Sequence, residues 1–132
     1  MKVFVDTNVL VAAFATRGLC ADVLRCILAE HQLVTGEVVL TELRRALIRR
    51  LKVPSRSVEA ILELLREYEV TPKPKADLPI RDPDDRWILA SAVDAKADVL
   101  ITGDEDLLDI ASSAPLRILA PRAFWDLVRT TR

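Results

Sequence analysis

Four acidic residues have the side-chain type and the spacing along the chain that are best suited to a catalytic or ligand-binding site. They are Asp6, Glu42, Asp85 and Asp104. Asp6 directly follows the apolar run 3–5, and Asp104 comes soon after the apolar run 99–101. Continuous apolar runs of this kind are typical of buried parallel strands, and open α/β sheets bind ligands at the carboxyl ends of their strands. The acids that follow strands could therefore meet in one crevice.

Each acid also has an ordinary structural explanation. Asp6 or Thr7 could simply cap the helix that follows. The acidic segments 82–85 and 104–106 could favour helix N-termini through the helix dipole. Glu42 could pair with arginines about one turn further along its helix. These explanations apply to each acid alone, whereas the joint pattern favours a shared site.

A group of converging carboxylates must be neutralised. Two carboxylates about 4 Å apart repel by roughly 4 kcal/mol at an effective dielectric constant of about 20, so the group needs a counter-charge or must take up protons. An all-oxygen set selects hard cations such as Mg²⁺ or Mn²⁺ and not zinc. His31 lies in no ligand spacing. Without a positioned histidine or serine triad, the metal would have to activate water and stabilise charge on phosphate, as in two-metal phosphodiester hydrolysis.

Composition describes an ordinary folded domain. The chain has 132 residues, of which 51% are hydrophobic and 30% are charged, enough to bury one core and solvate its surface. Lys and Arg total 19 against 20 Asp and Glu, so no global positive field attracts nucleic acid. Any nucleic-acid site must be local.

The sequence predicts a reduced, cytoplasmic protein. Cys20 and Cys26 form neither a zinc pattern nor a disulfide framework. No signal peptide pattern opens the chain, and no apolar stretch approaches the roughly 20 residues that span a bilayer. We therefore expect no membrane association.

Apolar runs alternate with segments of helical periodicity. The predicted strands cover residues 3–5, 32–35, 69–71, 99–101 and 116–119. Four predicted helices cover residues 9–14, 19–30, 38–51 and 121–128. A further helix is capped by Ser55 or Ser57 and runs to residue 65, another runs from Asp82 and Pro83 to about residue 95, and a short one begins at residue 104. The alternation favours a mostly parallel sheet covered by helices.

Four motifs in this order resemble the PIN-domain family, especially the VapC-like toxins and a neighbouring group of toxin-antitoxin components. The motifs are Val5 to Leu10, Thr41 to Leu43, Asp82 to Ile88 with Ala92, and Leu100 to Asp104 with Leu107 and Leu108. Each motif alone is weak, but four at this spacing along nearly the whole chain are specific.

The resemblance implies a single PIN-like domain over residues 1–132, built as a three-layer α/β/α sandwich with a central, mostly parallel five-stranded sheet. It implies metal-binding and catalytic roles for Asp6, Glu42, Asp85 and Asp104, with Asn8 and Thr102 as polar supports. Asp85 fits the family's third acid because an apolar residue follows three positions later and a small residue seven positions later, here Ile88 and Ala92. Two points stay open: whether Asp104 or Asp106 completes the site, and whether Asp82 is a cap or an outer ligand.

The resulting hypothesis is a Mg²⁺- or Mn²⁺-dependent ribonuclease that cuts single-stranded RNA. Asp6, Glu42 and Asp85 would hold one ion, and Asp104 would help hold a second or orient a water. Arg45 and Arg49 belong to the densest basic run, which either contacts the RNA backbone or is a solvated helix end.

Both tryptophans have two explanations. Trp87 and Trp125 could stack on bases, but each also falls at a helical spacing that suits core packing.

The resemblance also implies partners. A small antitoxin would insert its tail near the acids, and a homodimer would form through the early helices. The apolar sets Leu19, Val23, Ile27 and Ile61, Leu62, Leu65 could be an exposed contact patch or ordinary core.

The sequence allows two alternatives to a ribonuclease. A haloacid-dehalogenase-like phosphatase would need an aspartate two positions after Asp6, where the chain has Asn8. A PIN scaffold of little activity, which binds RNA or a protein partner, is the other alternative.

Overall fold

The structure is a computed structural model that describes residues 1–74 and 83–130, and the side chains of these residues except 83–85. Asp82, the proposed cap or outer ligand, therefore lies outside the described residues. The side chain of Asp85 is also outside them, although its backbone lies in a described helix.

Five parallel strands form the central sheet, in the order β3-β2-β1-β4-β5. The strands are β1 (Lys2–Val5), β2 (Gln32–Gly36), β3 (Glu69–Thr71), β4 (Val99–Ile101) and β5 (Arg117–Leu119). Two of the three inner strands, β1 and β4, carry the runs Val3–Val5 and Val99–Ile101, whose side chains are almost fully buried. Helices on both faces of the sheet bury these runs, which is why they are apolar without alternation.

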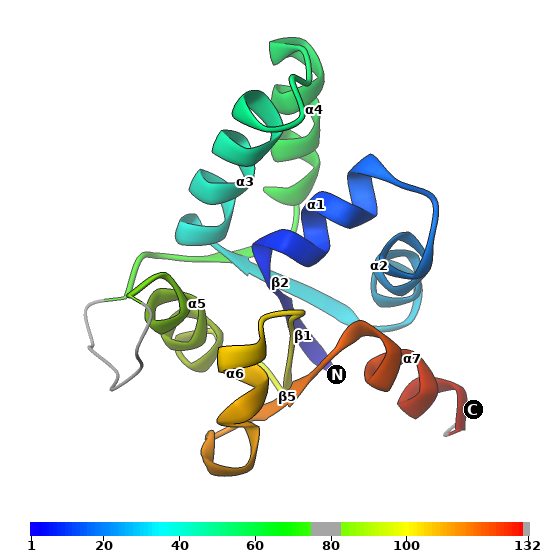
Figure 1. The fold of residues 1–132 in the computed structure, drawn as a ribbon, viewed down its shortest axis with the longest axis vertical. Coiled ribbons are helices and arrows are strands. Elements are labelled where there is room, and N and C mark those ends of the chain that lie inside the picture. The colour runs from blue at the N-terminus through cyan, green and yellow to red at the C-terminus, as the bar shows by residue number, and fades with distance from the viewer. Residues whose placement is uncertain (75–82, 131–132) are drawn as a thin grey trace.

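Helices cover the sheet on both faces (Figure 1). They are α1 (Thr7–Ala15), α2 (Leu19–Glu30), α3 (Glu37–Arg49), α4 (Ser55–Leu65), α5 (Pro83–Asp94), α6 (Glu105–Asp109), a 3₁₀ turn (Ala111–Ser113) and α7 (Pro121–Thr130). Right-handed crossovers put α1 to α4 on one face of the sheet and α5 and α6 on the other face. Helix α7 packs on α2. The expected three-layer α/β/α fold is confirmed. Among the described residues, no helix combines the length and apolarity needed to cross a bilayer.

The order of the strands places a switch point between β1 and β4. From β1 the chain moves outward to β2 and β3, then returns to β4 and moves the other way to β5. The connections therefore leave from opposite faces, and a crevice opens beyond the carboxyl ends of β1 and β4. The amide of Asp6 donates a 2.9 Å hydrogen bond to the carbonyl of Ile101, so the residues that leave the two strands stay side by side.

The two apolar sets that might have formed an exposed patch belong to the core. Val23, Ile27, Leu62 and Leu65 are at most 4% exposed. Their partly buried companions, Leu19 and Ile61, pack against the same core. The patch alternative is therefore wrong for these residues, because α2 and α4 turn these faces toward the core.

Helix starts show where local sequence signals were misleading. No serine side chain caps α4: Ser55 is its first residue, and the capping position is Pro54, at φ −59° and ψ 143°. Gly36 is the last residue of β2 and the capping residue of α3. A Cβ on Gly36 would lie 3.2 Å from Thr71 Cγ2 and 3.3 Å from Ser91 Cβ. Glycine suits this position because β3 and α5 approach the start of α3 so closely that a Cβ would force their side chains to shift by a few tenths of an ångström.

Candidate active site

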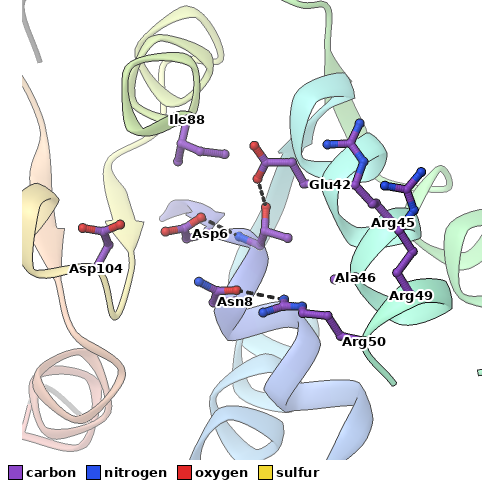
Figure 2. A pocket seen from close by; sticks show the side chains of 10 residues that line it. Asp6, Asn8, Glu42, Arg45, Ala46, Arg49, Arg50, Ile88 and Asp104 are labelled. Atoms are coloured by element: carbon purple, nitrogen blue, oxygen red, sulfur yellow. Dashed lines mark hydrogen bonds between the residues drawn. The ribbon is translucent and has the colours of Figure 1, made fainter. Parts of the chain in front are cut away.

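A pocket of about 410 Å³ opens beyond the carboxyl ends of β1 and β4. Its lining residues are Asp6, Thr7, Asn8, Glu42, Arg45, Ala46, Arg49, Arg50, Ile88 and Asp104. Figure 2 shows Asp6 at the centre, Asp104 on one side and α3 with Glu42 and the arginines on the other. The structure thus brings together three of the four acids that sequence analysis selected. Asp85 lies three residues before Ile88, in the first turn of α5.

Asp6 is both a helix cap and a pocket residue. Its side chain is buried, and Oδ1 accepts a 2.6 Å hydrogen bond from the amide of Thr7 at the start of α1. Oδ2 accepts a 2.6 Å hydrogen bond from the hydroxyl of Thr102. Burial raises the pKa of the Asp6 carboxyl, with a further rise from the charge of Asp104, and the two hydrogen bonds only partly oppose this. An ionised Asp6 therefore calls for a positive charge nearby.

Thr102 links the two strand-end acids. Its side chain is fully buried, donates to Asp6, and accepts a 3.0 Å hydrogen bond from the amide of Asp104. Asp104 Oδ1 in turn accepts a 2.8 Å hydrogen bond from the amide of Asp106, at the start of α6. Asp104 lines the pocket, and Asp106 is not one of its lining residues.

Thr7 connects the first strand to α3. Its hydroxyl donates a 2.8 Å hydrogen bond to Glu42 Oε2, while its amide binds Asp6. From the sequence, Thr7 is only an alternative helix cap, and this bridge to Glu42 is not apparent. The signal was its place directly after Asp6, but which residue its hydroxyl meets depends on how α3 packs across α1.

Three arginines at the carboxyl end of α3, the last of them its capping residue, form the positive wall of the pocket. Arg45 and Arg49, the two that the sequence singled out, line it together with Arg50. Arg50 Nη2 donates a 3.3 Å hydrogen bond to Asn8 Oδ1, so Asn8 contacts the arginine side of the pocket. Arg50 belongs to the same basic run in the sequence, but that run is equally typical of a solvated helix end, so the sequence did not distinguish Arg50 as a pocket residue.

The donors in the pocket suit a hard divalent cation. Asp6, Glu42 and Asp104 offer only oxygen, which Mg²⁺ and Mn²⁺ prefer. Within the described part of the chain, the hydrogen bonds to the buried Asp6 carboxylate come from uncharged donors, the Thr7 amide and the Thr102 hydroxyl. The three carboxylates surround the pocket without forming a tight cluster. Within the described residues, the group of potential ligands within 4.8 Å of one another is Cys26, Glu30 and His31, beside the opposite end of β2. That mixed set differs chemically from the pocket.

Comparison with known proteins identifies the family. The PIN domain family matches residues 2–106, so the chain belongs to the PIN domain family. PIN domains are generally nucleases and typically use divalent metal ions. Membership of the PIN domain family argues against the alternative of a haloacid-dehalogenase-like phosphatase. No curated protein matches the sequence significantly.

Solved structures share the fold at low identity. VapBC-1 from nontypeable Haemophilus influenzae is 20% identical, with a TM-score of 0.64 over 92% of this chain and 99% of that chain. VapBC2 from Rickettsia felis, bound to a DNA fragment from their promoter, is 16% identical, with a TM-score of 0.61 over 90% and 97%. FitAcB from Neisseria gonorrhoeae is 14% identical, with a TM-score of 0.60 over 90% and 97%. These likenesses concern the fold.

Proposed function

We propose that this protein is a Mg²⁺- or Mn²⁺-dependent endoribonuclease that cleaves single-stranded RNA. The observation that carries the proposal is the pocket at the switch point, where buried Asp6 lies between Asp104 and Glu42 and faces a wall of arginines. A carboxylate set that holds cations, beside guanidinium groups that bind phosphate, suits phosphodiester hydrolysis.

The acidic residues have the role of holding the ions. Asp6, Glu42 and Asp85 are the proposed ligands of one ion, and Asp104 helps to hold a second or orients a water. When bound, the cations supply charge stabilisation and water activation. Thr102 and Thr7 keep Asp6 and Glu42 in place through their hydroxyls, as the outer contacts of metal ligands commonly do.

The arginines have the role of binding the substrate backbone. Arg45, Arg49 and Arg50 are exposed side chains at the edge of the pocket. Guanidinium groups bind phosphate oxygens through paired N–H donors. A phosphate of the RNA can thus lie between the arginine wall and the acids. The net charge of −1 makes this attraction local.

The decisive experiment is cleavage of a mixed-sequence single-stranded RNA by the wild-type protein and by Asp6→Asn. Each is assayed with Mg²⁺, with Mn²⁺ and with EDTA. We expect metal-dependent cutting by the wild type and a loss of about 100-fold or more in Asp6→Asn, because an ion ligand in such chemistry supplies several kcal/mol of stabilisation.

Asp109→Asn is the matched control. Asp109 is an exposed acid at the end of α6 that does not line the pocket, so its variant should cut like the wild type. Folded wild-type protein that cuts no RNA with either ion would contradict the proposal and favour the alternative, a PIN scaffold of little activity that binds RNA or a protein partner.

We further propose that the protein is the toxin of a type II toxin-antitoxin pair, forms a homodimer and binds a small antitoxin protein. The similarity in fold to VapBC and FitAcB proteins supports this. Growth arrest on expression of the wild type, relieved in Asp6→Asn, is the expected result. Unimpaired growth at equal protein levels would argue for a nuclease with another role.

A further inference from the structure

A second, smaller cavity of about 230 Å³ adjoins the acidic pocket. It is lined by Glu37, Val38, Thr41, Glu42, Arg45, Lys73 and Trp87. Glu42 and Arg45 line both cavities. A linear substrate whose phosphate lies in the acidic pocket would therefore have its neighbouring group at this second cavity.

Trp87 has the features of a ligand contact. It is partly exposed and lines the cavity from α5. The protein's other tryptophan, Trp125, packs against the hydrophobic core, whereas Trp87 is not among the side chains that do so in the described part of the chain. A large aromatic ring at the wall of a cavity, without a core to fill, offers a stacking surface.

The charges at this cavity suit a nucleotide. Lys73 is exposed, and its Nζ lies 5.0 Å from the centroid of the Trp87 ring. Arg45 contributes a second cation, and the carboxylate of Glu37 is engaged by Arg66 through hydrogen bonds of 2.8 and 3.2 Å. An exposed cation–π contact is weaker than base stacking on an aromatic ring. A base can therefore displace Lys73 from the ring, and the freed ammonium can then bind a phosphate.

We propose that this cavity, the Trp87 subsite, binds the base of the nucleotide next to the scissile phosphate. Trp87 stacks on the base, Val38 and Thr41 form its floor, and Lys73 and Arg45 bind the flanking phosphates. The inference rests on the proposed ribonuclease function and adds a contact that positions the substrate and contributes to the choice of cut site. Stacking accepts every base, so preferences should follow stacking strength.

Tryptophan fluorescence tests the subsite without cleavage. In Asp6→Asn with Trp125→Phe, Trp87 is the remaining tryptophan, and a mixed-sequence oligoribonucleotide should quench it on titration. In Asp6→Asn with Trp87→Phe, Trp125 is the reporter and should stay unquenched. Quenching of Trp125 alone, or of neither tryptophan at concentrations where the RNA binds, would overturn the proposal.

Substitutions test the contribution to substrate binding. Trp87→Ala should weaken RNA binding about 30-fold, the middle of the range for one stacked base, and raise KM with little change in kcat. Trp87→Phe should restore most of the loss, which a purely structural role would not predict. Trp125→Phe is the matched control. Unchanged KM and binding in folded Trp87→Ala would overturn the subsite while leaving the nuclease intact.

The two proposals fail separately. If the wild type cuts no RNA, the nuclease proposal is lost, but the titration in the Asp6→Asn background still decides whether Trp87 meets a base. If the wild type cuts RNA and Trp87 stays unquenched, the subsite alone is wrong.

Discussion

At the scale of single residues, two threonine hydroxyls organise the acids of the pocket. Thr102 is fully buried between Asp6 and the amide of Asp104, and Thr7 joins Asp6 to Glu42. Each hydroxyl therefore holds a carboxylate of the pocket in position through a hydrogen bond. Such contacts make ligand positions independent of the bound ion.

Thr102→Val should lower cleavage by about 10- to 100-fold, the usual effect of removing a contact that orients a metal ligand. Valine keeps the shape of threonine but leaves Asp6 Oδ2 and the amide of Asp104 without this partner, which should also cost about 1–3 kcal/mol of stability. Initial rates at several Mg²⁺ concentrations and urea denaturation measure the two effects. Thr102→Ser keeps the hydroxyl and should retain most activity; an equal loss in both variants would show that the methyl group matters instead.

Asp6 predicts a pH-dependent stability in metal-free protein. Burial raises its pKa in the folded state above the unfolded value, so its contribution to stability is fully present below the unfolded pKa and is lost as pH rises through the folded pKa. At neutral pH, Asp6→Asn removes this penalty and should stabilise the EDTA-treated protein.

The measurement is urea denaturation of both proteins in EDTA from neutral pH downward, with Asp109→Asn as the control. The advantage of Asp6→Asn should shrink toward acid pH. A variant that is less stable than the wild type at neutral pH would mean that the hydrogen bond from Thr102 outweighs the burial of charge.

At the scale of elements, α3 carries both signs of charge to the same pocket. Glu42 lies in its middle, and Arg45 and Arg49 follow at intervals of three and four residues, which put them on one face. The helix starts at Gly36, where the close approach of β3 and α5 fixes its direction. The position of the arginine wall therefore depends on packing at the far end of the same helix.

The double variant Arg45→Gln with Arg49→Gln should bind RNA more weakly and with a smaller dependence on salt. For single strands the slope of log K against log salt falls by about 0.7 for each lost phosphate contact. Filter binding of labelled RNA to the Asp6→Asn background at several salt concentrations measures the slope. Arg56 and Arg122 are exposed and lie outside the pocket, so their double glutamine variant is matched in charge and should keep the original slope.

At the scale of the whole molecule, the reversal in strand order builds the site. Because β1 and β4 are neighbours although 93 residues lie between the end of β1 and the start of β4, the acids that follow them share one crevice. Helices α3 and α5 then enclose this crevice from the two faces of the sheet, bringing Glu42 and Ile88 to it. The fold and the candidate site are consequences of the same topology.

Cation binding should stabilise the folded molecule. An ion at 100 times its dissociation constant contributes about 2.7 kcal/mol, so Mg²⁺ or Mn²⁺ should raise the melting temperature by several degrees over EDTA. Differential scanning calorimetry of the wild type, of Glu42→Gln and of Cys26→Ser provides the comparison. Glu42→Gln should lose most of the rise in melting temperature. Cys26→Ser changes the group of Cys26, Glu30 and His31 and should keep the rise. A rise that is lost only in Cys26→Ser would place the ion at that group.

The sequence by itself determined the elements and the candidate acids. Continuous apolar runs mark β1 and β4, helical spacing marks α2 over its whole length, and acids directly after the strands mark the pocket. These are local signals, since burial on both faces requires an apolar run and the chain itself carries each acid to the end of its strand. Where the local signal was ambiguous, as for the start of α4, the predicted cap by Ser55 or Ser57 was wrong.

Only the tertiary structure decided which distant side chains meet. The hydrogen bonds of Thr7 to Glu42, Thr102 to Asp6 and Arg50 to Asn8 join residues 35 to 96 positions apart. Packing alone also decided that the apolar faces of α2 and α4 are core, and that Trp87 lines a cavity while Trp125 joins the core. The spacing of residues in one helix is the same whether its face meets solvent, ligand or core. The partner of that face is set by the order and twist of the sheet on which the helix packs.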